Sequence, residues 1–173
     1  GNFEREGYDS TGALRILRDM LRHDYLWITI RVKGGAYGRG GAFGRGGNAC
    51  ISSYRDPNVG RTLEVYRGIG DYVRNFEADE RQMTKYIIGT ISELDVPMNP
   101  SAKGKTSESA WFNGITEADF QQERDQILDA TLDDIHALAD LVDAALKQNN
   151  ICVVGSEAAI QKEKELFKNV ENL

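Results

Sequence analysis

Glycine is concentrated in one part of this 173-residue chain, and that concentration most limits how the chain can fold. Eight of the 18 glycines lie between Gly34 and Gly47. An apolar, helix-like run precedes them and ends in Arg31-Val32-Lys33. Because each glycine inside a helix costs about 1 kcal/mol relative to alanine, we expect this helix to end at Gly34-Gly35.

The glycine-rich part itself predicts a β-hairpin, with strands over residues 36–43 and 48–55 and a turn at Gly44–Gly47. Glycine supplies the positive φ angles that tight turns require. The first strand is unusual, because one of its faces carries only alanine and glycine, whereas the other carries Tyr37, Arg39 and Phe43. A glycine-rich strand usually marks a close approach of another backbone or of a ligand. The pattern therefore indicates a site near the hairpin.

The rest of the chain is mostly helical in pattern. Ser10 or Thr11 is expected to cap a first helix, which runs to about Ile30. Its apolar residues recur at helical spacing: Leu14, Leu17, Leu21, Tyr25 and Ile28. Further helices are expected to start at Asp56-Pro57, Asp79, Thr116 and Ser156, with a restart or kink at Thr131 and an end at Asn149-Asn150.

Two stretches between these helices carry more specific expectations. Residues 98–115 have a loop-like composition in which a short helix is allowed, and Ala110-Trp111-Phe112 is expected to pin the stretch to the core. Ile151–Val154 is apolar throughout and predicts a central strand.

The predicted order of elements defines the fold class as α+β, with an antiparallel-rich sheet packed against helices. Residues 1–173 form one domain in this interpretation. Only three strands are visible, and a stable sheet of this size would need more. The chain also opens at Gly1 without a methionine. We therefore expect a partial domain that lacks its first strands and belongs to a longer protein.

Composition excludes several classes of function. The net charge of −6 and the pI near 5.0 argue against general nucleic-acid binding, which requires positive charge. No apolar run approaches the length of a membrane span. Cys50 and Cys152 each lie in an apolar run, so we expect buried free thiols and a reducing, cytoplasmic location. The mitochondrial or plastid matrix is the alternative.

Motifs for metal, nucleophilic or phosphate chemistry are missing from the sequence. His23 and His136 stand alone, without HxxH, HxxEH or CxxC spacing, so we expect no metal site in this segment. The glycine-rich run leads into a strand rather than a helix, which disfavours a phosphate loop. Two RGG triplets, at Arg39 and Arg45, resemble RNA-binding tails, and an RNA-binding function remains an alternative that the acidic charge disfavours.

One pair of residues remains as a candidate site. Arg31 ends a helix and Tyr37 enters a strand across the double-glycine bend. A guanidinium group and a phenol that converge there could both donate hydrogen bonds to one carbonyl oxygen, and such donors matter most where negative charge develops in a transition state. The alternative is that Arg31 is a cation favoured by the helix dipole and that Tyr37 belongs to the core.

The run from Tyr25 to Gly38, with RVKGGAYG at its centre, resembles the C-terminal half of the M16 metallopeptidases, the pitrilysin and insulysin group. The presequence-protease subfamily is the most similar. SYRDPN at Ser53–Asn58, KYIIGTI at Lys85–Ile91 and Asp95 are similar to the same subfamily. The resemblance covers most of the chain.

This resemblance implies a parent enzyme with four related α+β domains that form a clam-shell of two halves. The first domain would bind zinc through an inverted HxxEH motif and a downstream glutamate, and the HxxEH glutamate would activate a zinc-bound water. The last domain would close over the chamber without binding metal. It would present Arg31 and Tyr37 to the substrate, next to substrate-binding residues Gly34, Gly35 and Ala36. Unfolded peptides would be held as an added strand.

Because HxxEH is absent from this chain, we expect the segment alone to be inactive. Its partners would be the N-terminal catalytic half of the same polypeptide and the peptide substrate, with no nucleic acid and no membrane. The alternative function is a catalytically inactive M16-like scaffold or peptide-binding module. Gly40 and Gly41, together with Arg39, make the first hairpin strand more glycine-rich than is expected of the family.

Overall fold

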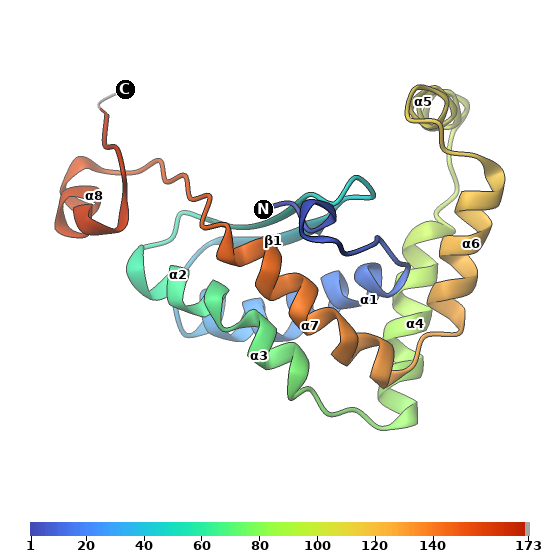
Figure 1. Ribbon diagram of the computed structural model, residues 1–173, viewed down its shortest axis with the longest axis horizontal. Helices are drawn as coiled ribbons and strands as arrows, with labels where there is room; N and C mark the ends of the chain where they lie inside the picture. Colours follow the sequence, from blue (N-terminus) through green and yellow to red (C-terminus); the bar gives the residue numbers. More distant parts are fainter. Residues whose placement is uncertain (172–173) are drawn as a thin grey trace.

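A computed structural model describes residues 1–171 of the chain as an α+β arrangement, with one two-stranded antiparallel sheet lying across helices (Figure 1). The helical elements are η1 (Glu4–Glu6), α1 (Ala13–Met20), η2 (Leu21–Tyr25), η3 (Trp27–Val32), α2 (Gly60–Arg67), α3 (Ile69–Arg74), α4 (Glu80–Leu94), α5 (Pro100–Phe112), α6 (Glu117–Leu128), α7 (Leu132–Lys147), α8 (Glu157–Lys162) and η4 (Lys164–Leu166); the strands are β1 (Gly38–Phe43) and β2 (Ala49–Tyr54).

The first long helix is made of α1 followed by two π-helical segments, η2 and η3. A π-helix has i→i+5 hydrogen bonds and therefore more residues per turn than an α-helix, so the buried face rotates relative to the expected spacing. Ile28 is 45% exposed, contrary to prediction, whereas Leu26 and Ile30 are fully buried in its place. The expected cap is present in part, because Oγ1 of Thr11 accepts from the N–H of Ala13, the first residue of α1, at 3.4 Å. The N-cap is Gly12, whose N–H donates to Oε1 of Gln126 at 2.7 Å.

The predicted hairpin is confirmed, with β1 pairing β2 in the register Gly38↔Tyr54 to Phe43↔Ala49. The first strand begins two residues later than expected. Side chains of β2 occupy the space beside the glycines of β1. A Cβ on Gly38 would lie 3.1 Å from Cβ of Tyr54, and a Cβ on Gly41 would lie 3.2 Å from Cδ1 of Ile51. The glycines therefore accommodate the partner strand.

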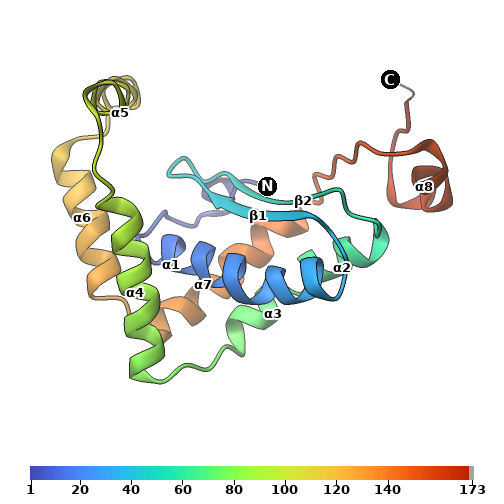
Figure 2. The ribbon, with the colours of Figure 1, turned by 180° about the vertical axis from the view of Figure 1, so that it is seen from behind.

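The predicted third strand is wrong. Residues 151–154 form no strand, and Val154 is 77% exposed. The segment leads away from the body toward α8, with no strand beside it (Figures 1 and 2). The expected burial of Cys152 is wrong for the same reason. Cys50 is also exposed, because successive side chains of β2 point to opposite faces of the sheet and Ala49, the neighbour of Cys50, points into the core.

The helix expected to begin at Asp56-Pro57 begins instead at Gly60. The Asp56 carboxylate shapes the preceding turn, since it accepts from the N–H of Asn58 at 2.9 Å and from Oγ1 of Thr62 at 2.7 Å. The predicted cap at Asp79 is confirmed, because its side chain accepts from the N–H of Gln82 at 2.7 Å.

Residues expected to be loop-like form α5, which Asn99 caps and in which Pro100 occupies the first turn. The helix lies at the far end of the arm formed by α4 and α6 (Figure 1). The prediction that Trp111 and Phe112 pin this stretch to the core is wrong, since they are 76% and 70% exposed. No side chain of α5 is buried within the described chain, because the arm carries this helix away from the body.

The predicted capping boxes at Thr116 and Thr131 are both present. α7 packs against α3 and α1 and contributes most to the core. Its expected end is confirmed, and Asn149 adopts φ 52 just beyond it. The largest fully buried side chains are Phe3, Ile16, Leu17, Met20, Leu21, Leu26, Ile30, Ile69, Val73, Ile127, Ile135 and Val142. Within residues 1–171, none of the helices has the length and hydrophobicity to cross a membrane.

Candidate functional site

Arg31 and Tyr37 lie together, as the sequence predicted. The guanidinium group of Arg31 donates a hydrogen bond to the backbone carbonyl of Tyr37, and its central carbon lies 5.6 Å from the centre of the Tyr37 ring. The Tyr37 side chain is 64% exposed, so the alternative that places it in the core is wrong. The pair therefore presents a positive charge and a phenol at the surface.

The double-glycine bend holds the pair in place. Gly35 adopts φ 79, and a Cβ on Gly34 would lie 2.4 Å from the carbonyl oxygen of Ile30. The N–H groups of Gly35 and Ala36 donate back to the carbonyls of Arg31 and Ile30, at 3.0 and 3.1 Å. These two N–H groups are thus used within the turn, and contact of residues 34–36 with a substrate stays a prediction.

The carbonyl of Gly34 accepts from Nδ2 of Asn58 at 2.6 Å, and that of Lys33 accepts from Arg61 at 3.1 Å. These bonds tie the bend to the segment that follows the hairpin. Asn58 lies within the SYRDPN run and Gly34 within the RVKGGAYG run, so these two runs of the sequence meet here.

Four further side chains extend the pair into what we call the arginine–aromatic cluster. The cluster consists of Trp27, Arg31, Tyr37, Arg39, Tyr54 and Arg55. The guanidinium carbons of Arg31 and Arg39 lie 5.0 and 4.7 Å from the centre of the Trp27 ring. Cation–π attraction of this kind favours such contacts.

At the other end of the cluster, Arg55 lies 5.9 Å from the ring centre of Tyr37 and 5.5 Å from that of Tyr54. The two tyrosine rings meet edge to face, with centres 6.2 Å apart. The sequence did not single out Trp27, Arg39, Tyr54 or Arg55 as site residues. A signal for Trp27 was present, because it precedes Arg31 by one helical turn.

Arg55 has an unusual backbone. Its φ is 48, in the left-handed region that non-glycine residues rarely adopt. Residues held in this region often occur at functional sites, where the surrounding structure over-determines their conformation. Here the paired end of β2 precedes Arg55 and the hydrogen-bonded Asp56 turn follows it. The strained position directs its side chain onto Tyr37 and Tyr54.

The cluster is positively charged, and none of its arginines has a carboxylate partner among the residues that the structure describes. Among residues 1–171, ion pairs form at six other arginines: Arg15, Arg18, Arg22, Arg45, Arg74 and Arg124. Arg31, Arg39 and Arg55 form none within this range. Burial, together with the nearby charges of Arg22 and Arg31, lowers the pKa of Arg39 below its ordinary value.

The histidines do not contribute to this site. His23 is exposed, and Nε2 of His136 lies 2.7 Å from the carbonyl oxygen of Phe76, a contact that joins α7 to the segment that follows α3. Within the described part of the chain, no three His, Cys, Asp or Glu side chains converge as a metal site would require. The cluster can bind and orient an electron-rich group.

Fold and site together define an α+β domain that carries exposed hydrogen-bond donors and no metal ligands of its own within the described residues. Residues 1–157 match the family described as the PreP C-terminal domain, and the chain belongs to this family of presequence-protease C-terminal domains within M16.

Individual relatives agree with this assignment. The chain is 45% identical over its full length to Protein HypA of Clostridium perfringens, of which it covers 18%. It is 35% identical to presequence protease 1, chloroplastic/mitochondrial, of Arabidopsis thaliana, over 90% of this chain and 14% of that protein. It is 32% identical to the mitochondrial presequence protease of Saccharomyces cerevisiae, over 74% of this chain and 13% of that protein. The chain thus spans less than a fifth of the length of these relatives.

Proposed function

We propose that this chain is the C-terminal segment of a zinc-dependent endopeptidase that degrades unfolded peptides, and that it closes the peptide chamber and contacts the substrate without binding the metal. The observation that carries the proposal is the Arg31–Tyr37 pair, which is exposed and held by the double-glycine bend. Membership of the presequence-protease family supports it.

In this proposal, Arg31 and Tyr37 bind the carbonyl oxygen of the bond to be cleaved. The hydrogen bond from Arg31 to the Tyr37 backbone orients the guanidinium group and leaves its other N–H groups for a ligand. The exposed Tyr37 hydroxyl supplies a second donor. Both bonds strengthen as the carbonyl oxygen gains negative charge, and such preorganised donors lower the barrier because they need no reorientation during the reaction.

Zinc would act from outside this chain, since the described residues contain no group suited to hold it. When bound in the N-terminal half of the polypeptide, it would supply an activated water. The peptide would lie in extended form along the hairpin. The hairpin edge already pairs with backbone of residues 1–3, where the Ala49 N–H donates to the Gly1 carbonyl at 2.8 Å and the Phe3 N–H donates to the Gly47 carbonyl at 2.8 Å. Such pairing supports strand addition as the mode of peptide binding.

Tyr37→Phe in the full-length protein tests the role of the hydroxyl. We expect kcat to fall about 100-fold, as happens when one oxyanion donor is lost, with zinc content unchanged by elemental analysis. Tyr8→Phe, which removes a hydroxyl from a half-buried tyrosine outside the arginine–aromatic cluster, should leave kcat unchanged. An unaltered kcat for Tyr37→Phe would remove the proposed role of the Tyr37 hydroxyl, whereas a full-length protein that cleaves no peptide at all would favour the inactive scaffold.

The cellular location that we propose is based on the names and organisms of the relatives. Presequence proteases that resemble the chain carry mitochondrial or chloroplastic in their names, whereas Protein HypA comes from a bacterium. We therefore propose an organelle matrix or the cytoplasm, according to the source organism.

A further inference from the structure

Two guanidinium groups share one indole ring in the arginine–aromatic cluster. Arg31 and Arg39 both lie against Trp27, at 5.0 and 4.7 Å from its ring centre. They come from different elements, since Arg31 lies in the last turn of η3 and Arg39 lies in β1. The aromatic ring therefore brings two like charges near one another, although like charges repel.

Neither charge is neutralised within the described residues. The chain has 27 acidic side chains, and six other arginines find partners among them. The Nε atom of Arg39 is buried without a hydrogen-bond acceptor in the part of the chain that the structure describes. A half-buried guanidinium group next to a like charge, with an unsatisfied N–H, is costly unless an anion completes the arrangement.

We infer that Arg39, together with Arg31, forms a subsite that binds a carboxylate of the peptide substrate. The inference rests on the proposed peptidase function and adds a substrate feature to it. Guanidinium groups bind carboxylates through paired, charge-assisted hydrogen bonds. Because Arg31 also belongs to the proposed carbonyl contact, the carboxylate would lie within a few residues of the bond that is cleaved.

A peptide carboxylate fits better than a nucleic-acid phosphate. A chain with a net charge of −6 repels a long polyanion, whose binding depends on many positive contacts. A peptide carries isolated carboxylates, either at its C-terminus or on Asp and Glu side chains. Two arginines on one aromatic ring match a single carboxylate.

The test measures binding of fluorescein-labelled peptides to the full-length protein by fluorescence polarisation, with a chelator present so that no peptide is cleaved. Three peptides share one sequence: one with a free C-terminal carboxylate, one amidated, and one amidated with a single Gln→Glu replacement. We expect a carboxylate to tighten binding about tenfold over the amidated peptide, which is the range of a hydrogen bond to a charged group. The terminal and side-chain peptides identify which source of carboxylate the subsite takes.

Arg39→Gln and Lys33→Gln form the matched pair of variants. Each removes one positive charge, but the exposed Lys33 lies outside the cluster. We expect the preference for carboxylate peptides to disappear in R39Q and to persist in K33Q. Equal binding of all three peptides by the unmodified protein, or a preference that survives in R39Q, would overturn the inference.

A separate cleavage assay without chelator distinguishes this inference from the proposed function. Cleavage of carboxylate and amidated peptides with equal KM and kcat would contradict the carboxylate subsite and support the peptidase function. Carboxylate-dependent binding without any cleavage would support the carboxylate subsite and contradict the peptidase function.

Discussion

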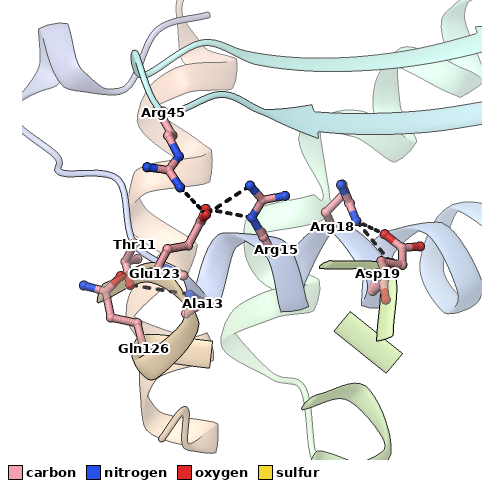
Figure 3. Close-up of polar contacts among 10 residues, drawn as sticks. Thr11, Ala13, Arg15, Arg18, Asp19, Arg45, Glu123 and Gln126 are labelled. Atoms are coloured by element: carbon pink, nitrogen blue, oxygen red, sulfur yellow. Dashed lines mark hydrogen bonds and ion pairs between the residues drawn. The ribbon is translucent and has the colours of Figure 1, made fainter. Parts of the chain in front are cut away.

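Arg45 at the turn of the hairpin forms an ion pair with Glu123 on α6, 78 residues later in the sequence (Figure 3). Arg15 on α1 reaches the same carboxylate, with Nε 2.7 Å from Oε1 and a terminal nitrogen 3.1 Å from Oε2. One carboxylate therefore connects the hairpin, the first helix and the arm of α4 and α6. Phe120 also contacts Arg45, whose guanidinium carbon lies 4.8 Å from its ring centre.

Replacing Glu123 by Gln should destabilise the protein by about 1–3 kcal/mol, because hydrogen bonds to a charged group are lost and two arginines keep their charge. Burial raises the pKa of Glu123, but the hydrogen bond and charge of Arg15 and the charge of Arg45 outweigh it and leave the pKa below its ordinary value. The stabilisation is therefore complete above the ordinary pKa of 4.5 and is lost as pH falls through the lower, folded-state pKa.

Thermal unfolding of wild type and E123Q between pH 3 and 7 measures this difference. The difference in Tm between wild type and E123Q should be constant near neutral pH and should decrease at acidic pH. Glu117→Gln is the matched control, because its side chain is exposed on the same helix. An equal loss of Tm in both variants would show that the ion pairs contribute little.

Asp19 is expected to behave in the opposite way. It is buried on α1, which packs against α4, and its Oδ1 lies 3.8 Å from a terminal nitrogen of Arg18 but has no hydrogen-bond partner within the described residues. Burial and the charge of Glu93 raise the pKa of Asp19, against the opposing charges of Arg18, His23 and Arg22.

Because the folded state holds this proton more tightly, stability falls as pH rises from the ordinary pKa of 3.8 through the raised one. Asp19→Asn should therefore increase stability at pH 7 by about 1 kcal/mol, since it removes a buried charge that is poorly compensated. The gain should vanish at pH 3. The exposed Asp9→Asn serves as control, and a lower Tm for D19N at pH 7 would contradict the prediction.

Thr131→Ala removes the cap of the central helix α7 and should cost about 1 kcal/mol. In the capping box, Oγ1 of Thr131 donates to Oδ2 of Asp134 at 2.6 Å and its backbone N–H does so at 2.8 Å. These bonds lower the pKa of Asp134. The variant should therefore also raise that pKa, which an NMR titration of the carboxyl carbon measures. A lower Tm with an unchanged pKa of Asp134 would mean that the start of α7 rearranges and that the Asp134 carboxylate still accepts hydrogen bonds there.

Trp111→Ser should change the stability of the chain by no more than about 0.5 kcal/mol, because the side chain is exposed on α5. Ile135→Ala, by contrast, empties a fully buried position and should cost about 2–5 kcal/mol. Chemical denaturation of both variants measures the two effects. A large loss in the Trp111 variant would show that α5 packs against the body after all.

Features that depend on a few neighbouring residues could be predicted from the sequence. The caps at Asp79, Thr116 and Thr131 are bonds to N–H groups three residues away, and the hairpin turn depends on the torsions of adjacent glycines. The meeting of Arg31 with Tyr37 belongs to the same category, since only six residues and a double-glycine bend separate them.

Features that depend on distant neighbours required the tertiary structure. Apolar composition predicted a buried strand at residues 151–154 and a core role for Trp111, but burial needs a partner surface, and the body of the domain does not extend to either position. The arginine–aromatic cluster combines η3 with both hairpin strands and the residue after them. The cluster is positively charged because no carboxylate lies within reach of its arginines in the described residues. Tertiary packing decides this, since a long side chain forms an ion pair only with a group that the fold brings within a few ångströms.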